Sequence, residues 1–260
     1  MPPSTTSSIK TRSNKWYGWL PDLPDQRDLR FPQVSKPALR KLPPAVDLRG
    51  GCSPVENQGN LGSCTANALV GALEFLELKA GQPLVDLSRL FIYYNERVIE
   101  GRVKEDSGAF MRDGIKALAK LGVCAETSWP YKIAKFAQKP TAACYIQAQQ
   151  HLIASYHRLA TVDDMRACLA GGYPFVFGFS VYEAFESAVV AASGVVNLPL
   201  PAETLLGGHA VVGVGYDDKS QRFIVRNSWD RDWGQKGYFT MPYAYLADRN
   251  LADDFWTIRK

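Results

Sequence analysis

The segment Gln58–Ala68, QGNLGSCTANA, decides the fold because it places a cysteine where a glycine-rich turn becomes a helix. Gly59 and Gly62 precede Cys64, and glycine lets a backbone turn tightly and approach a ligand closely. A cysteine in the first turn of a helix lies near the positive end of the helix dipole, which favours the thiolate. The segment therefore indicates a reactive thiol; the alternative is a buried cysteine that packs as a small apolar side chain.

Apolar residues continue from Cys64 at helical spacing, which predicts a helix over 64–79. Two further helices are expected over 87–98 and 111–121. The second half of the chain is rich in Val, Phe and Tyr between Gly and Asp turns, and it predicts strands over 175–181, 209–216, 222–228 and 237–241. A helix-rich half followed by a strand-rich half is typical of an α+β fold with two lobes.

The composition is that of a globular protein, with 46% hydrophobic and 22% charged residues in a chain of 260. No apolar run approaches the roughly 18 residues that a membrane helix needs. The first twenty residues contain no uninterrupted apolar stretch, so we expect no secretory signal, and either a cytoplasmic protein or export by a signal-independent route. Five cysteines are too few for a disulfide scaffold, and reduced thiols are expected.

The net charge of +4 is concentrated at one end of the chain. Residues 1–41 hold eight Lys or Arg and three Asp, whereas the other 219 residues hold 22 basic and 23 acidic side chains. A nucleic-acid-binding protein normally carries a basic face on its folded body, so we expect no nucleic-acid partner.

The N-terminal extension changes character near residue 16. Residues 1–15 are small, polar and basic, which predicts a disordered tail. Residues 16–20 are WYGWL, and Pro21 and Pro24 then favour an extended path. Aromatic surface is costly to leave in water, so this stretch is expected to dock. It is either a strap over the protein's own surface or a regulatory segment that covers a functional cleft.

Two later segments hold polar residues beside strands. His209 opens an apolar strand after two glycines, and Asn227 ends another strand beside a tryptophan. An asparagine in that place can orient an imidazole ring, although a structural histidine and a turn asparagine are the alternatives. The other two histidines, His151 and His157, would not share a helix face, and no cysteine completes a zinc spacing. We therefore expect no metal.

Together these segments resemble the papain-like cysteine peptidases, from about Leu42 to the C-terminus. Residues 43–49, PPAVDLR, are similar to the start of the family's mature enzyme. The matches to the family's site are the oxyanion-hole glutamine, the nucleophile, the catalytic histidine and the asparagine motif: Gln58, Cys64, His209 and Asn227-Ser228-Trp229. The histidine lies within the roughly 130–150 residues downstream of the cysteine that the family pattern allows, and the asparagine lies slightly beyond it.

The resemblance implies a two-lobed papain-like fold, with a helical lobe over about 52–145, an antiparallel β-barrel-like lobe over about 146–260, and the active-site cleft between them. It implies a cysteine endopeptidase that hydrolyses peptide or protein substrates through a Cys-His-Asn triad and a thioester, without metal or cofactor. Residues 1–41 would be an extension before a peptidase domain at 42–260. Because extensions in this family commonly block the cleft, these residues are expected to act as an inhibitory pro-segment.

Substrate contacts also follow from the resemblance. Residues 106–111, DSGAFM, stand where the family has a glycine strand that pairs with the substrate backbone. The expected substrate-binding residues are Ser107, Gly108, Phe110, Met111, Ala210 and Trp229. Phe110, Met111 and Ala210 would line the pocket for the second residue before the cut, and their apolar character predicts bulky hydrophobic side chains there. For Met111, ordinary core packing is the alternative.

The sequence departs from the family's usual pattern at two positions, and it leaves one cysteine pairing and two rival functions open. Leu61 stands where the family usually has a cysteine and Thr65 where it has a tryptophan, which indicates a divergent, bacterial-type branch. Cys124 and Cys144 can pair across a loop, although the sequence does not establish the pairing. The rival functions are another acyl-transfer enzyme of this architecture, such as a transglutaminase or an amidase, and a catalytically silent binding protein.

Overall fold

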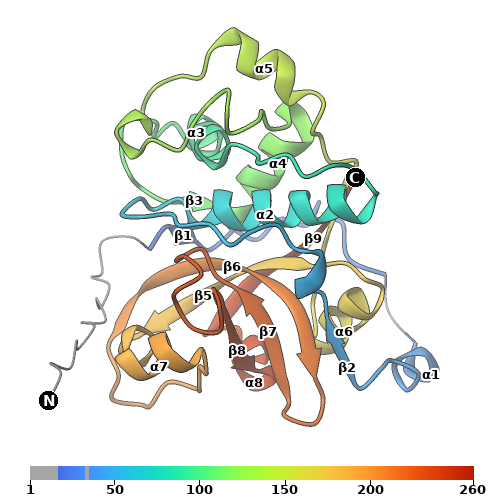
Figure 1. Ribbon diagram of the computed structural model, residues 1–260. Coiled ribbons are helices and arrows are strands. Elements are labelled where there is room, and N and C mark those ends of the chain that lie inside the picture. The colour runs from blue at the N-terminus through green and yellow to red at the C-terminus, as the bar shows by residue number, and fades with distance from the viewer. Residues whose placement is uncertain (1–16, 33–34) are drawn as a thin grey trace, which may run out of the picture.

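The computed structural model describes residues 17–32 and 35–260. The predicted tail at residues 1–15, together with Trp16, lies outside the described residues. Figure 1 shows several helices gathered on one side of the molecule and, on the other, a large curved sheet with further short helices around it; the longest helix, α2, runs between the two sides. This arrangement confirms the predicted α+β fold with two lobes.

The helical lobe is built from α2 (Cys64–Lys79), α3 (Arg89–Glu100), α4 (Met111–Leu121) and α5 (Ala142–Ala148). The helices outside this lobe are α1 (Lys36–Leu39), α6 (Val162–Ala170), α7 (Ala188–Ser193) and α8 (Tyr243–Ala247). The helices predicted over 64–79 and 111–121 are confirmed. The helix predicted over 87–98 is α3, which begins at Arg89 because Ser88 caps it by accepting a hydrogen bond from Phe91 N. It ends at Glu100, and Gly101 follows with a φ of 71°.

The other lobe is a seven-stranded antiparallel sheet. Its strands are β2 (Ala45–Asp47), β4 (Ser155–Arg158), β5 (Phe175–Tyr182), β6 (Leu205–Asp217), β7 (Arg222–Arg226), β8 (Tyr238–Pro242) and β9 (Ala252–Arg259). Their order is β4-β9-β5-β6-β7-β8, with β2 paired to β6. A separate parallel pair joins β1 (Trp19–Leu20) to β3 (Ala109–Phe110).

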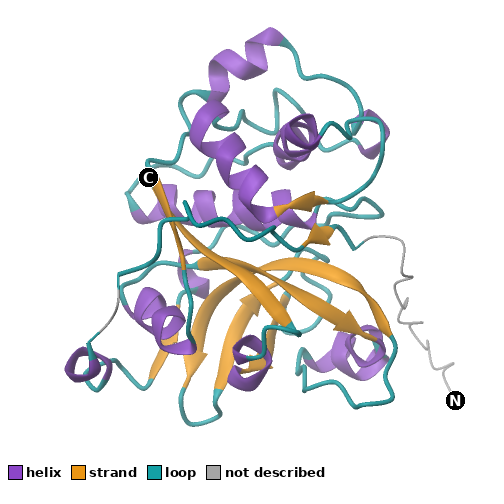
Figure 2. Cartoon of the chain, turned by 180° about the vertical axis from the view of Figure 1, so that it is seen from behind, coloured by secondary structure: helices purple, strands orange, loops and turns teal. Residues whose placement is uncertain are grey.

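The expectation of a barrel-like lobe needs a correction, because the sheet is open. Across the described residues, β4 pairs with β9 and β8 pairs with β7, and these two outer strands do not meet. Seen from behind in Figure 2, the strands curve strongly, but the sheet still has two edges. Closure needs every strand to have two neighbours, and here the edge strands have one each.

The two lobes meet along α2, which is buried on almost every face. Arg226, from β7, crosses to this helix and donates to Ser53 O at 2.9 Å and to Pro54 O at 2.6 Å. Ser53 Oγ in turn donates to Glu74 Oε2 on α2 at 2.5 Å. Burial raises the pKa of Glu74 to about 7. These buried contacts fix the helix that begins at Cys64 against the sheet.

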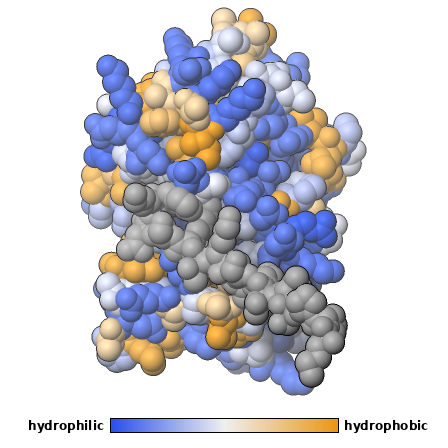
Figure 3. Space-filling view, turned by 60° about the vertical axis from the view of Figure 1, so that its left-hand side comes forward, coloured by the Kyte–Doolittle hydropathy of each residue, from blue (hydrophilic) through white to orange (hydrophobic). Residues whose placement is uncertain are grey.

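Apolar side chains on the face in Figure 3 form several separate patches, with polar side chains between them. Large exposed hydrophobic residues do occur, among them Val189, Leu198, Leu200 and Leu205. No helix in the described part of the chain is both long and apolar enough to span a bilayer.

Candidate active site

Cys64 is the first residue of α2, directly after a turn that holds Ser63 in place. The Ser63 hydroxyl lies 2.5 Å from Tyr131 Oη, so it does not cap the helix. The Cys64 sulfur lies within hydrogen-bond reach of the backbone N–H groups of Thr65, Ala210 and Gly18. The helix start and these N–H groups would all stabilise a negative sulfur.

His209 and Asn227 come from neighbouring strands of the sheet. His209 lies in β6, and Asn227 directly follows β7, whose last residue pairs with Val212 of β6. His209 Nε2 donates to Asn227 Oδ1 at 2.8 Å. The Trp229 ring lies 5.0 Å from the imidazole at an interplanar angle of 30°. The asparagine therefore fixes the ring orientation, and the tryptophan packs against the imidazole.

Gln58 lies in the loop before α2 and is fully buried. Its Nε2 donates to Leu61 O at 2.9 Å, and its Oε1 accepts a 2.6 Å hydrogen bond from Ser228 Oγ. The backbone N of Gln58 also donates to Ser228 O at 2.9 Å. Since Ser228 adjoins Asn227, these bonds couple the loop that carries Cys64 to the loop that carries Asn227. The structure thus brings together the four residues that the sequence matched to the family's site.

The expected substrate-binding residues do not all lie together: Phe110 is half-buried, belongs to neither hydrophobic cluster and lines a surface hollow with Leu23. Ala109 and Phe110 form β3, and Gly108 precedes it with a φ of 71°. The Ser107 hydroxyl donates to Gly108 O at 3.1 Å. Met111 and Ala210 are buried in one hydrophobic cluster, and that cluster also contains Trp19.

Residues 17–31 form what we call the strap, and its first four residues lie across the site. Gly18 O accepts a 2.7 Å hydrogen bond from Ala109 N. A Cβ on Gly18 would lie only 1.7 Å from Gly62 O, so only glycine fits there. The ring of Tyr17 lies 6.1 Å from His209. Cys64 and His209 are accordingly fully buried.

The covered thiol does not have the low pKa that a reactive thiolate needs. Burial raises the pKa of Cys64 to about 11, and the N–H groups of Ala210 and Gly18 only partly offset this. The dipole argument from the sequence therefore does not describe the covered site, because it ignored the loss of water around the sulfur. Water excluded by the strap outweighs the helix dipole here.

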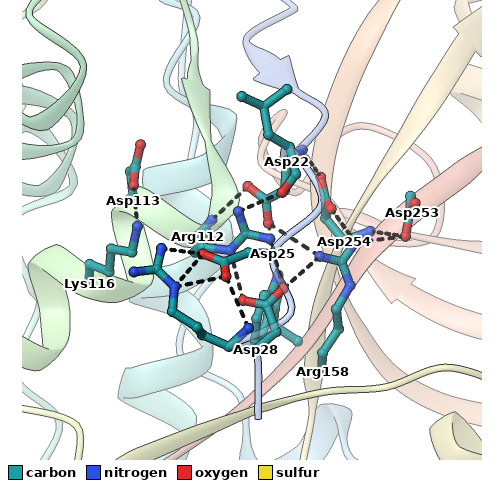
Figure 4. Close-up of polar contacts among 12 residues, drawn as sticks. Asp22, Asp25, Asp28, Arg112, Asp113, Lys116, Arg158, Asp253 and Asp254 are labelled. Carbon is teal, nitrogen blue, oxygen red and sulfur yellow. Dashed lines mark hydrogen bonds and ion pairs between the residues drawn. The ribbon is translucent and has the colours of Figure 1, made fainter. Parts of the chain in front are cut away.

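The C-terminal half of the strap is held by a cluster of charged side chains that the sequence did not predict (Figure 4). We call it the Asp22 cluster, and it consists of Asp22, Asp28, Arg112, Arg158 and Asp254. Arg112, from α4, donates to both Asp28 oxygens at 2.9 and 2.7 Å. Asp22 N donates to Asp254 Oδ2, and Arg158 donates to Asp254 Oδ1, each at 2.7 Å. The strap is thereby tied to α4, β4 and β9 together.

Three buried carboxyl groups and two guanidinium groups make the Asp22 cluster short of positive charge. Burial raises the pKa of Asp22 to about 7, and the nearby Asp254 carboxyl adds to the shift. Burial also raises the pKa of Asp254. Arg112 and Arg158 oppose these shifts without cancelling them. The closed strap therefore favours the protonated form of Asp22.

The remaining cysteines and histidines lie in other surroundings. All five cysteines are free thiols, and Cys168 lies with its sulfur 3.2 Å from Thr257 Oγ1. Cys124 and Cys144 are not joined in a disulfide, and Cys144 Sγ donates to Ser128 O at 3.6 Å. His151 Nδ1 lies 2.7 Å from Glu77 Oε1. Within the described ranges, no group of three or more His, Cys, Asp or Glu side chains is arranged to hold a metal.

Comparison with known proteins gives the family. The model for "Papain family cysteine protease" matches residues 42–253. The solved structure of xylellain, a cysteine protease from Xylella fastidiosa, superposes with a TM-score of 0.89 at 46% identity, covering 97% of this chain and 98% of that one. The chain therefore belongs to the papain family of cysteine proteases, and it is a hydrolase.

More distant relatives agree with this assignment. A peptidase C1-like protein of Acanthamoeba polyphaga mimivirus is 41% identical, over 94% of this chain and 86% of the viral protein. Rat cathepsin S is 31% identical over 77% of this chain, and the match spans 60% of cathepsin S. Against maize cysteine proteinase 2 the match spans only 55% of the relative's length. A beetle procathepsin L shares the fold, with a TM-score of 0.71 at 21% identity.

Proposed function

We propose that the protein is a cysteine endopeptidase with Cys64 as nucleophile, His209 as acid and base, and Asn227 as the residue that orients the imidazole. The observation that carries this proposal is the hydrogen bond from His209 Nε2 to Asn227 Oδ1, next to a cysteine at a helix start. Since Nε2 donates to Asn227, we assign proton exchange with the thiol and the leaving group to Nδ1 of His209.

Each chemical step has a residue to perform it. Once water can enter, Cys64 transfers its proton to His209, and the thiolate attacks the carbonyl carbon of the scissile bond. The imidazolium then protonates the leaving amine as the C–N bond breaks, which leaves a thioester on the sulfur. His209 next removes a proton from water, the hydroxide attacks the thioester, and the acid product leaves with Cys64 restored.

The negative oxygen of each tetrahedral intermediate needs hydrogen-bond donors. The Gln58 side-chain amide and the backbone N–H of Cys64 lie at the same end of α2 and can serve this role. Gln58 is already held by Leu61 and Ser228, so it needs no rearrangement at the moment of reaction. Loss of one such donor typically lowers kcat by about 10²–10³.

We also propose that the strap inhibits the enzyme in the closed chain, as part of an inhibitory extension over residues 1–41 that precedes a peptidase domain at 42–260. Three features support this: Gly18 lies against the nucleophile's turn, Tyr17 covers His209, and both catalytic groups are fully buried. A substrate carbonyl cannot reach a sulfur that protein atoms enclose, so the strap must leave before catalysis. Its own first residues are thus the enzyme's first ligand.

The peptidase proposal is tested with Cys64→Ala and Asn227→Ala in the full chain. Cys64→Ala should abolish hydrolysis of fluorogenic peptides and labelling by an epoxide thiol inhibitor while the melting temperature changes little. Asn227→Ala should lower kcat less than His209→Ala does, because the asparagine only orients the ring. Wild-type turnover in Cys64→Ala would show that this thiol is not the nucleophile.

Inhibition by the extension is tested by comparing the full chain with residues 42–260. The shorter chain should hydrolyse peptides faster, and an added peptide of residues 16–31 should slow it. If deletion leaves the rate unchanged and only lowers the melting temperature, the strap is structural and does not inhibit.

A further inference from the structure

The Trp19 side chain fills a site that catalysis itself does not require. The residue is only 7% exposed, and its Nε1 donates to Asp254 Oδ2 at 3.0 Å. A Cβ on Gly178 would lie 1.9 Å from the indole, and one on Gly208 would lie 2.7 Å from it. Two glycines on the neighbouring strands β5 and β6 thus leave a flat surface for a ring. We call Gly178, Gly208 and Asp254 the indole site.

Asp254 is held in an unusual conformation at this place. Its φ is 56°, in the left-handed region, and its side chain is 1% exposed. It lies on β9 beside an irregularity, where the pairing of β5 with β9 shifts register between Val176 and Gly178. A bulge of this kind redirects a side chain out of the normal alternation. Strain of this kind concentrates where function requires a particular side-chain direction.

Opening of the strap would leave one oxygen of this carboxyl without its donors. Asp254 Oδ2 accepts from Trp19 Nε1 and from Asp22 N, and both donors belong to the strap. Asp254 Oδ1 keeps its 2.7 Å hydrogen bond from Arg158, which belongs to β4. A buried acceptor without a donor is costly, so the open site favours a ligand that brings an N–H group.

We propose that Asp254 determines substrate specificity, and that the open indole site binds a tryptophan side chain at the second substrate residue before the scissile bond. This inference rests on the proposed peptidase function. The position follows from the strap, because Trp19 adjoins the residue that lies on Cys64 and pairs in register with Ala109 of β3. Met111 and Ala210, expected to line the pocket for that substrate residue, are in the same apolar cluster as Trp19.

The charges that face Asp254 favour a neutral donor over a cationic one. Arg158, from β4, is paired with Asp254, and Arg112, from α4, faces the same cluster. When Asp22 and Asp28 leave with the strap, these two guanidinium groups lose half of their counter-charges. Asp253 remains, but it is shared with Arg249 and Arg158. An arginine or lysine entering the site would therefore meet cations, whereas an indole N–H would not.

The test compares two fluorogenic peptides that differ only in Trp or Phe at the second residue before the cut, with the full chain as enzyme. The ratio of their kcat/KM values does not depend on how often the strap opens, because both peptides need the same open enzyme. A hydrogen bond to a carboxylate predicts a Trp:Phe ratio of about 10 to 100. A wild-type ratio of one or less would overturn the proposal, and so would a peptide with Arg there that is cleaved faster than the Trp peptide.

Three variants assign the ratio to the carboxyl group. Asp254→Gly removes it and suits a positive φ, so the ratio should fall to about one. Asp254→Asn keeps the shape of the side chain without its charge, and it should lower the Trp:Phe ratio by several-fold. It replaces the glycine variant if that variant does not fold. Asp163→Asn is the control, because it makes the same change in a surface ion pair with Arg166 outside the Asp22 cluster, and it should keep the wild-type ratio. An unchanged ratio in both Asp254 variants would contradict the proposal.

The outcomes also separate this proposal from the peptidase function. If both peptides are cleaved at equal rates, only the role of Asp254 is wrong. If neither peptide is cleaved and an epoxide does not label Cys64, the peptidase proposal fails, and this one fails with it. If the epoxide labels Cys64 but cleavage is too slow to measure, Trp and Phe peptide aldehydes are compared as protectors of the thiol, and the same ratio is expected between their half-protecting concentrations.

Discussion

The two halves of the strap contact the same body by different physical means. Residues 17–20 are uncharged and lie against glycines, with Gly18 at Gly62 and Trp19 at Gly178. Residues 22–31 are instead held by carboxyl and guanidinium groups, and by backbone hydrogen bonds from Phe31 N to Arg158 O and from Arg158 N to Leu29 O. Only the first half covers Cys64 and His209.

The two halves therefore contribute to closing the site in different ways. The covering half depends chiefly on close approach, which falls off within a fraction of an ångström. Hydrogen bonds from Tyr17 Oη to Glu186 Oε1 and from Trp19 Nε1 to Asp254 Oδ2 add to it. The anchoring half depends on charge, so it responds to protonation and to any change in the balance of carboxyl and guanidinium groups. The following predictions test whether residues 17–20 block the site and residues 22–31 hold the strap in place.

The largest expected effect is that of pH on the anchor. Asp22 has a pKa raised to about 7 in the closed strap, against 3.8 for a free side chain. The closed state therefore binds the proton more tightly than the open state does. The stabilisation of the closed state by this proton is complete below the free pKa of 3.8, and it is lost as the pH rises through the closed-state pKa of about 7. Opening should increase by up to about tenfold per pH unit between these values.

Hydrogen exchange at the Ala109 amide, which donates to Gly18 O, measures this opening once it is corrected for the intrinsic rate. The groups that face Asp22 are Asp254, Asp28, Arg112 and Arg158, and of these Asp254 shifts in the same direction. Asp22→Asn is the control, because it cannot titrate at this position. The same pH dependence in Asp22→Asn would exclude this aspartate as the source.

Removal of an anchoring cation should have the next largest effect. Arg112→Ala leaves Asp28 with Arg158 alone, and it removes the hydrogen bond to Leu23 O. Loss of one partner of a buried ion pair costs about 3–5 kcal/mol. We expect the lower limit because Asp28 keeps Arg158 as a partner, and this corresponds to about 100-fold more opening of the strap. Peptide hydrolysis by the full chain measures it.

Lys116→Ala provides the matched control on the same helix, because Lys116 forms only an exposed pair with Asp113. That variant should change the rate less than about fivefold. Equal effects of the two substitutions would mean that α4 is perturbed generally and that Arg112 is no anchor.

A smaller effect is expected from the covering half. In Gly18→Ala, the added Cβ would meet Gly62 O, so the strap must lift from the Cys64 turn while its anchor stays in place. Overpacking of this kind costs about 1–3 kcal/mol, which corresponds to about 5- to 150-fold faster labelling of Cys64 by an epoxide. The melting temperature should fall by only a few degrees.

Gly50→Ala is the control for Gly18→Ala, since a Cβ at Gly50 meets no atom within 4 Å. It should leave the labelling rate as it is in the wild type. If Gly18→Ala labels no faster than Gly50→Ala, close approach does not hold the covering half.

Local patterns in the sequence were enough for the main helices and the central strands. The spacing of apolar residues gave α2 and α4 their observed bounds, and the Val- and Phe-rich runs marked β5 to β8. The strand β9 was missed although it lies inside the sheet, between β4 and β5. Two acidic residues stand near its start, and Asp254 leaves the extended conformation there, so the strand lacks a regular alternation.

The site could be predicted only in part, for a related reason. A local pattern, the glycine-rich turn before a helix, indicated Cys64 as a reactive thiol, whereas the roles of Gln58, His209 and Asn227 were assigned through the order and spacing of the family's motifs. The Asp22 cluster joins the strap to α4, β4 and β9 across long stretches of chain, and no period or motif connects such residues. The raised pKa of Cys64 likewise depends on a covering segment whose path only the folded structure gives.

The place of β9 inside the sheet sets the order in which a newly made chain can mature. Domains generally fold as units during synthesis, so a domain is completed only when its last element is available. Cys64, His209 and Asn227 all leave the ribosome before residues 252–259, yet the sheet is incomplete without that strand. The same strand carries Asp254 and Trp256, which bond to Trp19 and Asp22 of the strap. A nascent chain thus acquires its cover in the same step that completes its catalytic lobe, so newly made enzyme emerges already closed.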